Sequence, residues 1–347
     1  MPVCEKKILF VGEEISFASR YRVEHFREQL HYQGYGSDFY QVDEVEDLDW
    51  DAYRAVVCYR CSREDVVCKV VEQAKKTGLN VYYDIDDLIF DYERISYLHF
   101  LTGSEYKDFK KTTEQIHSCM ELCDGYFTST DTLAGEIRRE FPGKPVVINR
   151  NCASMEMQIL SHDAVEQVEK DPEHISIGYF SGSKTHDQDF EVAEEAILEV
   201  MKEHPEVRLK LVGVLSDRKM EKFGNKVEKL PFMDWKQLPS VMAGIDIKDS
   251  IFHCSKSENK WMEAALVKVP SVMSRNREME GVIENGVDGW LCSDKEEWKK
   301  ALTTLIEEKT ARVQMGEKAH KKVMCQYVTQ NTGKDAREEL LCSEKYS

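Results

Sequence analysis

The sequence "SENKWMEAALVKVPSV" (residues 257–272) predicts a short helix followed by an apolar strand, and this unit sets the fold expected for the whole chain. Ser257 is a preferred N-cap residue, and Glu258 suits the first turn because the start of a helix carries partial positive charge. Lys260 lies in the same turn, where the helix dipole disfavours a cation. Two interpretations follow: a solvated lysine, or a lysine that binds an anion together with the helix N-terminus.

The same alternation of strand and helix extends over the rest of the chain, which is typical of parallel α/β sheets. In the first half we expect strands at 7–14, 37–42, 55–60, 80–87, 125–130 and 144–151, and helices at 19–33, 63–77, 104–123 and 131–141. In the second half we expect strands at 174–183, 207–214, 226–233, 244–247, 270–274 and 289–293, and helices at 187–203, 235–243, from 257, near 277–285 and from 294 onward.

A polar, acidic segment at 156–173 separates the two halves and is expected to join two domains. The predicted fold is therefore α/β, with two doubly wound Rossmann-like domains at 1–165 and 166–325. A helical tail at 326–347 follows and could cross back to the first domain. In such sheets ligands bind outside the carboxyl ends of the strands, so the loops after the strands are the places to look for a site.

The composition limits the function. The net charge of −17 argues against a nucleic-acid-binding protein, which needs a dense basic surface, and against strong attachment to anionic lipid. No stretch of 18 apolar residues and no apolar signal segment occurs, so we expect a cytoplasmic protein. Eleven scattered cysteines suggest reduced core thiols, and the isolated Cys58–Cys61 pair is a weak zinc candidate.

The loop "YFSGSKTHDQDF" (179–190) is the first candidate for binding a phosphate. Gly182 allows close approach of the backbone, Ser183 and Thr185 supply hydroxyls, and Lys184 supplies a positive charge. An ordinary turn between strand and helix explains the loop alone equally well. The case strengthens beside residues 257–272, because both stretches are strand-to-helix junctions of the same half.

Convergence of the two junctions would make a diphosphate site with Lys184 and Lys260 as its cations. Glu263, one helical turn further on, could accept hydrogen bonds from vicinal ribose hydroxyls. The alternative is an exposed helix carboxylate, although apolar residues flank Glu263 on both sides and a buried carboxylate needs partners.

In the first half, "DIDD" places Asp84, Asp86 and Asp87 at the end of an expected strand. Adjacent carboxylates repel each other, so Asp86 or Asp87 could serve as a catalytic base or bind acceptor hydroxyls. Helix capping by the same two residues is equally acceptable. "SRYR" (19–22) places Arg20 and Arg22 after the first strand, either at the same site or as a solvated helix start.

Several of these stretches resemble one family. "IGYFSGSKTHDQDF", "LPSVMAGIDI" and "KSENKWMEAALVKVPSVMSRNREMEGVIENGVDGWLC" resemble the C-terminal half of family 4-type glycosyltransferases of the GT-B fold. "KILFVGEEISFASRYRVEHFREQL" and "VYYDIDDLIFD" resemble the N-terminal half of a bacterial branch that builds surface polysaccharides. The resemblance implies an N-terminal acceptor domain and a C-terminal domain that binds a nucleotide sugar.

By that resemblance, Glu263 matches the glutamate that holds the ribose, and Lys260 matches the basic residue beside the diphosphate. The common motif separates two glutamates by seven residues, whereas four separate Glu258 from Glu263, as in a shortened "SxxKxxEA" version. Two further departures are Gln188 in place of the usual basic residue before the helix, and "GIDIKDSIF", which is shorter than the family's strand and loop.

The resemblance implies a glycosyltransferase that moves a sugar from a nucleotide-diphosphate donor to a hydroxyl of a glycan, free or lipid-linked. We expect retention of anomeric configuration, no cofactor, no metal, and at most peripheral contact with the inner face of the membrane. Two alternatives stay open: a sugar-nucleotide epimerase of similar architecture, and a degenerate binding module in a glycan-assembly complex.

Overall fold

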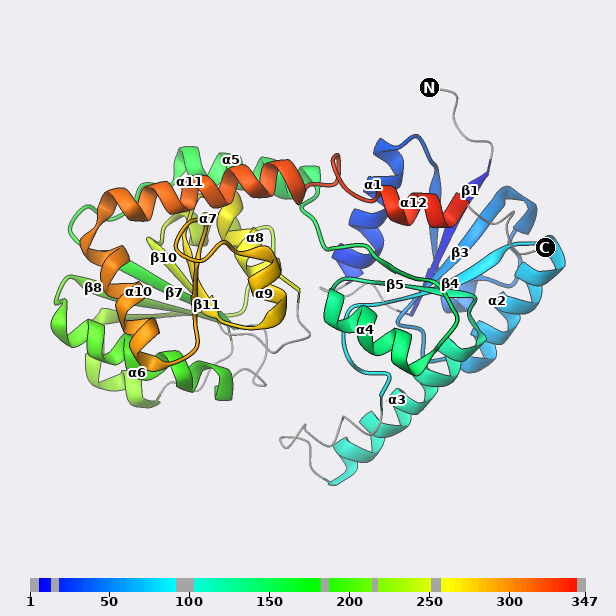
Figure 1. The fold of residues 1–347 in the computed structure, drawn as a ribbon, viewed down its shortest axis with the longest axis horizontal. Helices are drawn as coiled ribbons and strands as arrows, with labels where there is room; N and C mark the ends of the chain where they lie inside the picture. The colour runs from blue at the N-terminus through cyan, green and yellow to red at the C-terminus, as the bar shows by residue number, and fades with distance from the viewer. Residues whose placement is uncertain are drawn as a thin grey trace. The chain divides into compact units, whose positions relative to one another are not determined.

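A computed structural model describes residues 6–13, 19–91, 103–181, 187–213, 218–250 and 257–341, and every structural statement below concerns these residues (Figure 1). The chain divides into two compact units. Unit 1 contains the described residues of 1–152 and 329–347 together with Ser257. Unit 2 contains those of 153–254 and 258–328.

Unit 1 is a parallel six-stranded sheet in the order β2-β1-β3-β4-β5-β6. Its strands are β1 (Lys7–Gly12), β2 (Ser37–Gln41), β3 (Tyr53–Tyr59), β4 (Asn80–Ile85), β5 (Gly125–Thr128) and β6 (Val146–Ile148). Its helices are α1 (His25–Tyr32), which continues a π-helical turn η1 (Arg20–Glu24), α2 (Glu64–Thr77), α3 (Gly103–Leu122), α4 (Asp131–Glu140) and α12 (Lys334–Leu341). Short 3₁₀ turns, η2 (Val42–Glu44) and η3 (Trp50–Ala52), follow β2 and precede β3.

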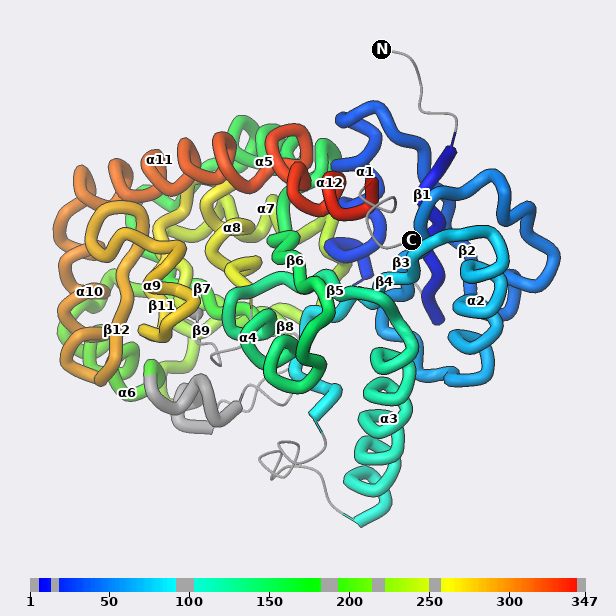
Figure 2. Tube along the Cα trace, turned by 45° about the vertical axis from the view of Figure 1, so that its right-hand side comes forward, coloured from blue at the N-terminus to red at the C-terminus, as the bar shows by residue number. Residues whose placement is uncertain are grey.

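Helices cover both faces of this sheet, so the strands are apolar on both sides, as parallel strands require. Alternate residues of each strand point to opposite faces: Leu9 packs with α2, α3 and α4, whereas Phe10 packs with α1 and α12. Figure 2 shows α12, coloured red, beside the blue beginning of the same unit. Ala336 and Leu340 of α12 are buried against that face of the sheet.

Unit 2 repeats the plan with the order β12-β11-β10-β7-β8-β9, again parallel. Its strands are β7 (Ile175–Ser181), β8 (Val207–Gly213), β9 (Val227–Leu230), β10 (Ile247–Ser250), β11 (Ser271–Ser274) and β12 (Trp290–Cys292). Its helices are α5 (Met155–Gln167), α6 (Asp187–Glu203), α7 (Leu238–Ala243), α8 (Asn259–Leu266), α9 (Arg277–Val282), α10 (Lys295–Glu307) and α11 (Lys309–Gln326), with a 3₁₀ segment η6 (Arg218–Lys226) before β9. Helices α6 and α10 cover one face, and α5, α7 and α8 cover the other (Figure 1).

The predicted α/β class and the alternation of elements are confirmed. The expected joining segment at 156–173 is wrong in part, because Met155–Gln167 is helix α5. Its residue Ala164 is buried in the same core cluster as Met242 of α7, so the helix belongs to unit 2. The boundary between the units therefore falls at Cys152/Ala153 and not at 165/166.

The cysteines within the described ranges are free thiols, and Cys58, Cys61, Cys119 and Cys123 are buried in the core of unit 1. No described helix combines the length and apolarity that crossing a membrane would require.

Gly316 in α11 tests the packing of unit 2. A Cβ there would overlap the carbonyl oxygen of Lys268, a residue already held at a left-handed φ of 59°. Gly316→Ala should therefore lower the free energy of unfolding by about 1–3 kcal/mol, since helix and turn must move apart.

Gly281→Ala in α9 is the control, because a Cβ meets no other atom there. This variant should raise the free energy of unfolding by up to about 1 kcal/mol. Urea unfolding followed by tryptophan fluorescence measures both, because every tryptophan except Trp50 lies in unit 2. If the Gly316→Ala variant were as stable as the unmodified protein, the predicted clash would be contradicted.

Candidate functional site

The carboxyl edge of the unit 2 sheet is where the donor-side candidates were expected. Strands β7 and β10 are hydrogen-bonded neighbours, with Tyr179 opposite Asp249, and both run to this edge. The loop that follows β7 contains Gly182, Ser183, Lys184 and Thr185, and these four candidates lie outside the described residues. The described residues of this edge that can be compared with the prediction are therefore those of α8 and the two strands.

Helix α8 begins at Asn259, and Glu258 is its N-cap residue, without a capping hydrogen bond from its side chain. The prediction of Ser257 as the N-cap is wrong. The Ser257 hydroxyl instead accepts a hydrogen bond from the side-chain amide of Asn151 at 3.1 Å. Glu258 is fully buried, so it is part of the packing of this helix start.

Lys260 is not a solvated lysine. Its side chain as a whole is half-buried, and its Nζ atom is buried. The Nζ atom lies 5.8 Å from the centroid of the Tyr179 ring on β7. That contact holds the ammonium group over an aromatic face, a favourable position for a cation. The interpretation of Lys260 as a solvated surface lysine is therefore excluded. The other interpretation, a lysine that binds an anion together with the helix N-terminus, stays a prediction.

Glu263 follows one turn later, with its side chain 17% exposed. Its neighbours Trp261, Met262, Ala264 and Ala265 are buried, as their apolar character predicted. The carboxylate of Glu263 lies 3.8 Å from the ammonium of Lys248 on β10. Lys260 and Glu263 thus lie one helical turn apart on α8, and a third charged residue lies beside them.

Sequence reasoning missed Lys248. Its side chain is completely buried, and its Nζ donates a hydrogen bond of 2.6 Å to the backbone carbonyl of Lys260. Burial lowers the pKa of Lys248 to about 7, partly opposed by the Glu263 carboxylate. The available signal was a lysine in the middle of an otherwise buried strand, "GIDIKDS", where charge is rare without a partner.

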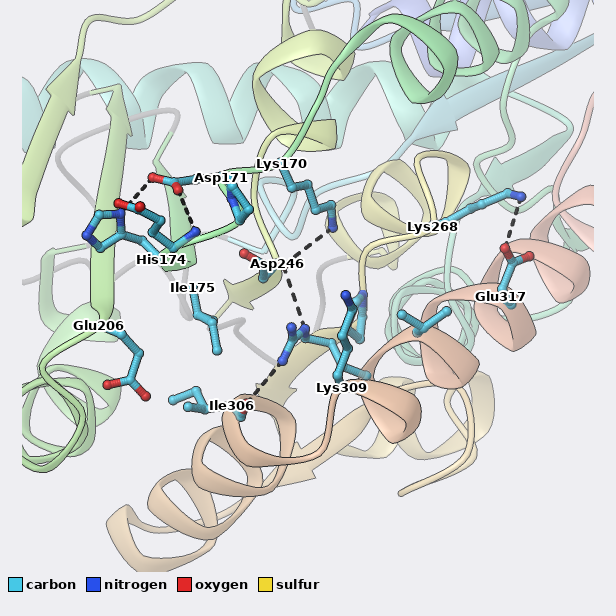
Figure 3. A pocket seen from close by; sticks show the side chains of 15 residues that line it. Lys170, Asp171, His174, Ile175, Glu206, Asp246, Lys268, Ile306, Lys309 and Glu317 are labelled. Carbon is cyan, nitrogen blue, oxygen red and sulfur yellow. Dashed lines mark hydrogen bonds and ion pairs between the residues drawn. The ribbon is translucent and has the colours of Figure 1, made fainter.

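A cavity of about 540 Å³ at the other edge of unit 2 is not this site (Figure 3). Its lining residues Ile175, Asp246 and Pro270 come at or before the starts of β7, β10 and β11. Asp246 lies 3.9 Å from Lys170 and 3.7 Å from Arg312, and its carboxylate accepts from the backbone N–H of Ser176. The cavity therefore lies at the amino ends of the strands, opposite the edge where α/β sheets bind ligands.

At the carboxyl edge of the unit 1 sheet, Arg22 and Asp84 form a buried bidentate pair. Two hydrogen bonds of 2.8 Å join the guanidinium to the carboxylate, and neither side chain is more than 1% exposed. Arg22 also donates to the backbone carbonyl of Asn149 and, at 3.0 Å, to the side-chain oxygen of Asn151. The interpretation of Arg22 as part of a solvated helix start is wrong.

Burial raises the pKa of the Asp84 carboxyl to about 6 while Arg22 opposes that shift, so Asp84 is ionised at neutral pH. Arg20 is also buried, with its guanidinium carbon 4.5 Å from the centroid of the Tyr21 ring. The structure thus brings Arg22 together with Asp84, and keeps both arginines out of bulk solvent.

Asp86 and Asp87 share a different cation, Arg60 at the end of β3. Arg60 lies 2.6 Å from Asp86 and 3.7 Å from Asp87, and Asp86 is 11% exposed. Arg60 adopts a left-handed φ of 47°, a costly backbone conformation for a residue with a Cβ. Helix capping does not explain these aspartates: Asp87 accepts from the N–H of Leu88, and residues 86–91 form no helix.

Comparison with known proteins supports the expected class. Residues 159–322 match the family model of glycosyl transferases group 1. No curated protein matches the chain. The solved structure of Anabaena Alr3699/HepE in complex with UDP is similar, with a TM-score of 0.66 and 14% identity over 97% of this chain and 100% of that chain.

Two further solved structures share the fold. A glycosyltransferase from Rickettsia africae gives a TM-score of 0.69 at 11% identity, over 99% of this chain and 100% of that one. WaaG, a glycosyltransferase involved in lipopolysaccharide biosynthesis, gives 0.62 at 12% identity, over 96% and 99%. The predicted GT-B fold is confirmed, and so is the resemblance to glycosyltransferases, which the family model finds in residues 159–322. The finer assignment to family 4 stays a prediction.

The Arg22–Asp84 pair yields a test of how unit 1 holds its carboxyl edge. Asp84→Leu should cost about 3–5 kcal/mol of unfolding free energy, because it leaves the buried guanidinium uncompensated. The double variant Arg22→Met/Asp84→Leu should cost clearly less than the sum of the two single variants. The control is Lys7→Ala, which breaks an exposed pair with Asp38 and should cost at most about 1 kcal/mol. If the loss of unfolding free energy in the double variant equalled the sum of the losses in the two single variants, Arg22 and Asp84 would not be energetically coupled.

Proposed function

From the glycosyl transferases group 1 domain at residues 159–322, we propose that this protein transfers a sugar from a nucleotide-diphosphate donor to a hydroxyl of a glycan. The observation that carries the proposal is the pair Lys260 and Glu263, one helical turn apart on α8 and beside the buried Lys248. A cation and a carboxylate one helical turn apart suit the diphosphate and the ribose of one nucleotide.

The proposed donor contacts follow from charge. Lys260 and the N-terminus of α8 would hold the diphosphate, with Lys184 as the second cation and Gly182, Ser183 and Thr185 closing around the phosphates. Glu263 would accept hydrogen bonds from the ribose hydroxyls, with the buried Glu258 supporting the helix start. Because Anabaena HepE has been solved with UDP and with UDP-glucose, uridine nucleotides are the first donors to test.

The proposed chemistry is cleavage of the bond between the anomeric carbon and the diphosphate oxygen, with attack by an acceptor oxygen. Negative charge then develops on the departing diphosphate, where lysine ammonium groups and helix N–H groups stabilise it. The leaving phosphate would accept the acceptor's proton on the same face of the sugar, so that configuration is retained. No metal is needed in this scheme.

On the acceptor side, Asp86 and Asp87 are the proposed carboxylates, whereas the buried Arg22 supports this edge of the sheet through its pair with Asp84. Since Arg60 lies 2.6 Å from Asp86, this carboxylate suits a fixed hydrogen-bond acceptor for a sugar hydroxyl better than a free base. WaaG acts in lipopolysaccharide biosynthesis, which supports a surface polysaccharide or glycoconjugate as the product. The proposed setting is the cytoplasm, with at most peripheral contact with a membrane that carries a lipid-linked acceptor.

A binding module without transfer activity is the second candidate. The short strand β10, with a buried lysine and an aspartate in "IKDS", is the observation that favours it. Both candidates bind the donor, whereas only the transferase releases nucleoside diphosphate when an acceptor glycan is added. An epimerase would instead convert the donor sugar without any acceptor.

Donor binding is tested by thermal unfolding with UDP, since a ligand that binds only the folded state stabilises it by mass action. Lys260→Ala should weaken UDP binding by about 1.5–3 kcal/mol, the scale of a hydrogen bond to a charged group. Lys236→Ala, which removes an exposed lysine paired with Glu156 in the same unit, should leave the affinity unchanged. Equal affinities of the Lys260→Ala variant and the unmodified protein would remove Lys260 from the site.

Metal dependence gives a separate test. Because the proposed stabilising groups are lysines and helix N–H groups, sugar transfer should persist in excess EDTA. Lys184→Ala and Lys260→Ala should each lower kcat more than they raise the KM for acceptor. Asp86→Asn and Asp87→Asn should change acceptor use and leave UDP affinity intact. Loss of transfer in EDTA, with loss of UDP binding in either aspartate variant, would instead assign those carboxylates to a metal.

A further inference from the structure

Lys248 is an unusual residue for the centre of a parallel strand. It lies on β10 between β7 and β11, opposite Gly178 on one side and Ser271 on the other, and its side chain is completely buried. A buried ammonium group is costly unless it has partners, so its contacts indicate what the residue does.

The ammonium of Lys248 contacts α8 at two places. It donates a 2.6 Å hydrogen bond to the backbone carbonyl of Lys260, and it lies 3.8 Å from Oε2 of Glu263. The Phe180 ring on β7 and the thioether of Met242 on α7 also lie near the ammonium, at 5.3 Å and 3.8 Å. One buried cation therefore touches the backbone of the proposed diphosphate residue and the carboxylate of the proposed ribose residue.

We propose that Lys248 is a positioning residue that orients the Glu263 carboxylate toward the ribose hydroxyls of the donor. This proposal rests on the proposed function, because it assigns Glu263 to the ribose. At 3.8 Å the contact is an electrostatic attraction rather than a short hydrogen bond, so Lys248 attracts the carboxylate without occupying it as a close donor would. An ionised carboxylate accepts hydrogen bonds only, which suits two hydroxyl donors on one ribose.

The same geometry makes ribose recognition depend on pH. The charged groups that face Lys248 from the surrounding elements are Glu263 and Lys260 on α8, whereas β7 and α7 contribute the neutral Phe180 and Met242. Burial and Lys260 together lower the pKa of Lys248 to about 7. As the pH rises through that value Lys248 loses its charge, Glu263 loses its cation, and the preference for a ribose with both hydroxyls should fall.

The experiment compares the dissociation constants of UDP and of 2′,3′-dideoxy-UDP by calorimetry at about pH 6 and about pH 8.5, either side of the lysine's pKa. The unmodified protein should prefer UDP by about tenfold or more at the lower pH, the scale of hydrogen bonds to a charged group, and less at the higher pH. Lys248→Met should show a smaller preference that does not change with pH. The matched control is Lys210→Met on β8, which pairs with β7 and not with β10; Lys210 lies 3.5 Å from Glu228, and its loss should not affect the preference.

The outcomes of this experiment distinguish the proposed function from the positioning role of Lys248. Absence of any UDP, ADP or GDP binding by the unmodified protein overturns the proposed function and this inference with it. Binding with an unchanged preference in Lys248→Met overturns the inference alone. If Lys248→Met does not fold, the pH series of the unmodified protein decides, because a preference that stays constant across the pKa of Lys248 overturns the role of its charge.

Discussion

Parallel strands bring all their carboxyl ends to one edge of a sheet, and the arrangement of this protein depends on that constraint. Each strand must be followed by a crossover that returns to the other end, so helices cover both faces and the strands are buried on both sides. In unit 2 the carboxyl ends of β7 and β10 are adjacent and α8 begins close by, which is why residues distant in sequence, such as Tyr179, Lys248 and Lys260, come into contact.

Both units place ions in their cores near these edges, with different partners. In unit 1 a bidentate pair of 2.8 Å hydrogen bonds satisfies Arg22 and Asp84, so the pair is fixed. In unit 2 the cation Lys248 has a carbonyl at 2.6 Å and a carboxylate at 3.8 Å, a looser arrangement. The first suits a rigid scaffold, and the second suits a carboxylate that must also bind a ligand.

The order of strands and helices could be predicted because two-sided burial produces apolar runs such as Ile8–Val11 and apolar stripes on the helices between them. Helix α5 was missed because its sequence is polar, and only packing against α7 identifies it. Ser257 was misassigned because a cap depends on backbone angles and on competing partners, here Asn151. The proximity of Lys260 and Glu263 could be predicted because the two residues lie three positions apart on one helix. The contacts of Lys248 and Arg60 could not be predicted, since their partners come from other elements and no periodicity in the sequence links them.

The chain of unit 2 is inserted into that of unit 1, whose last helix, α12, comes from the end of the described sequence. During synthesis, unit 2 can therefore be complete before unit 1 is. Until Ala336 and Leu340 emerge, Phe10, Val57 and Phe127 on one face of the first sheet lack part of their cover. An apolar face left partly open in this way favours aggregation or binding by chaperones, so the nascent chain stays vulnerable until α12 has emerged.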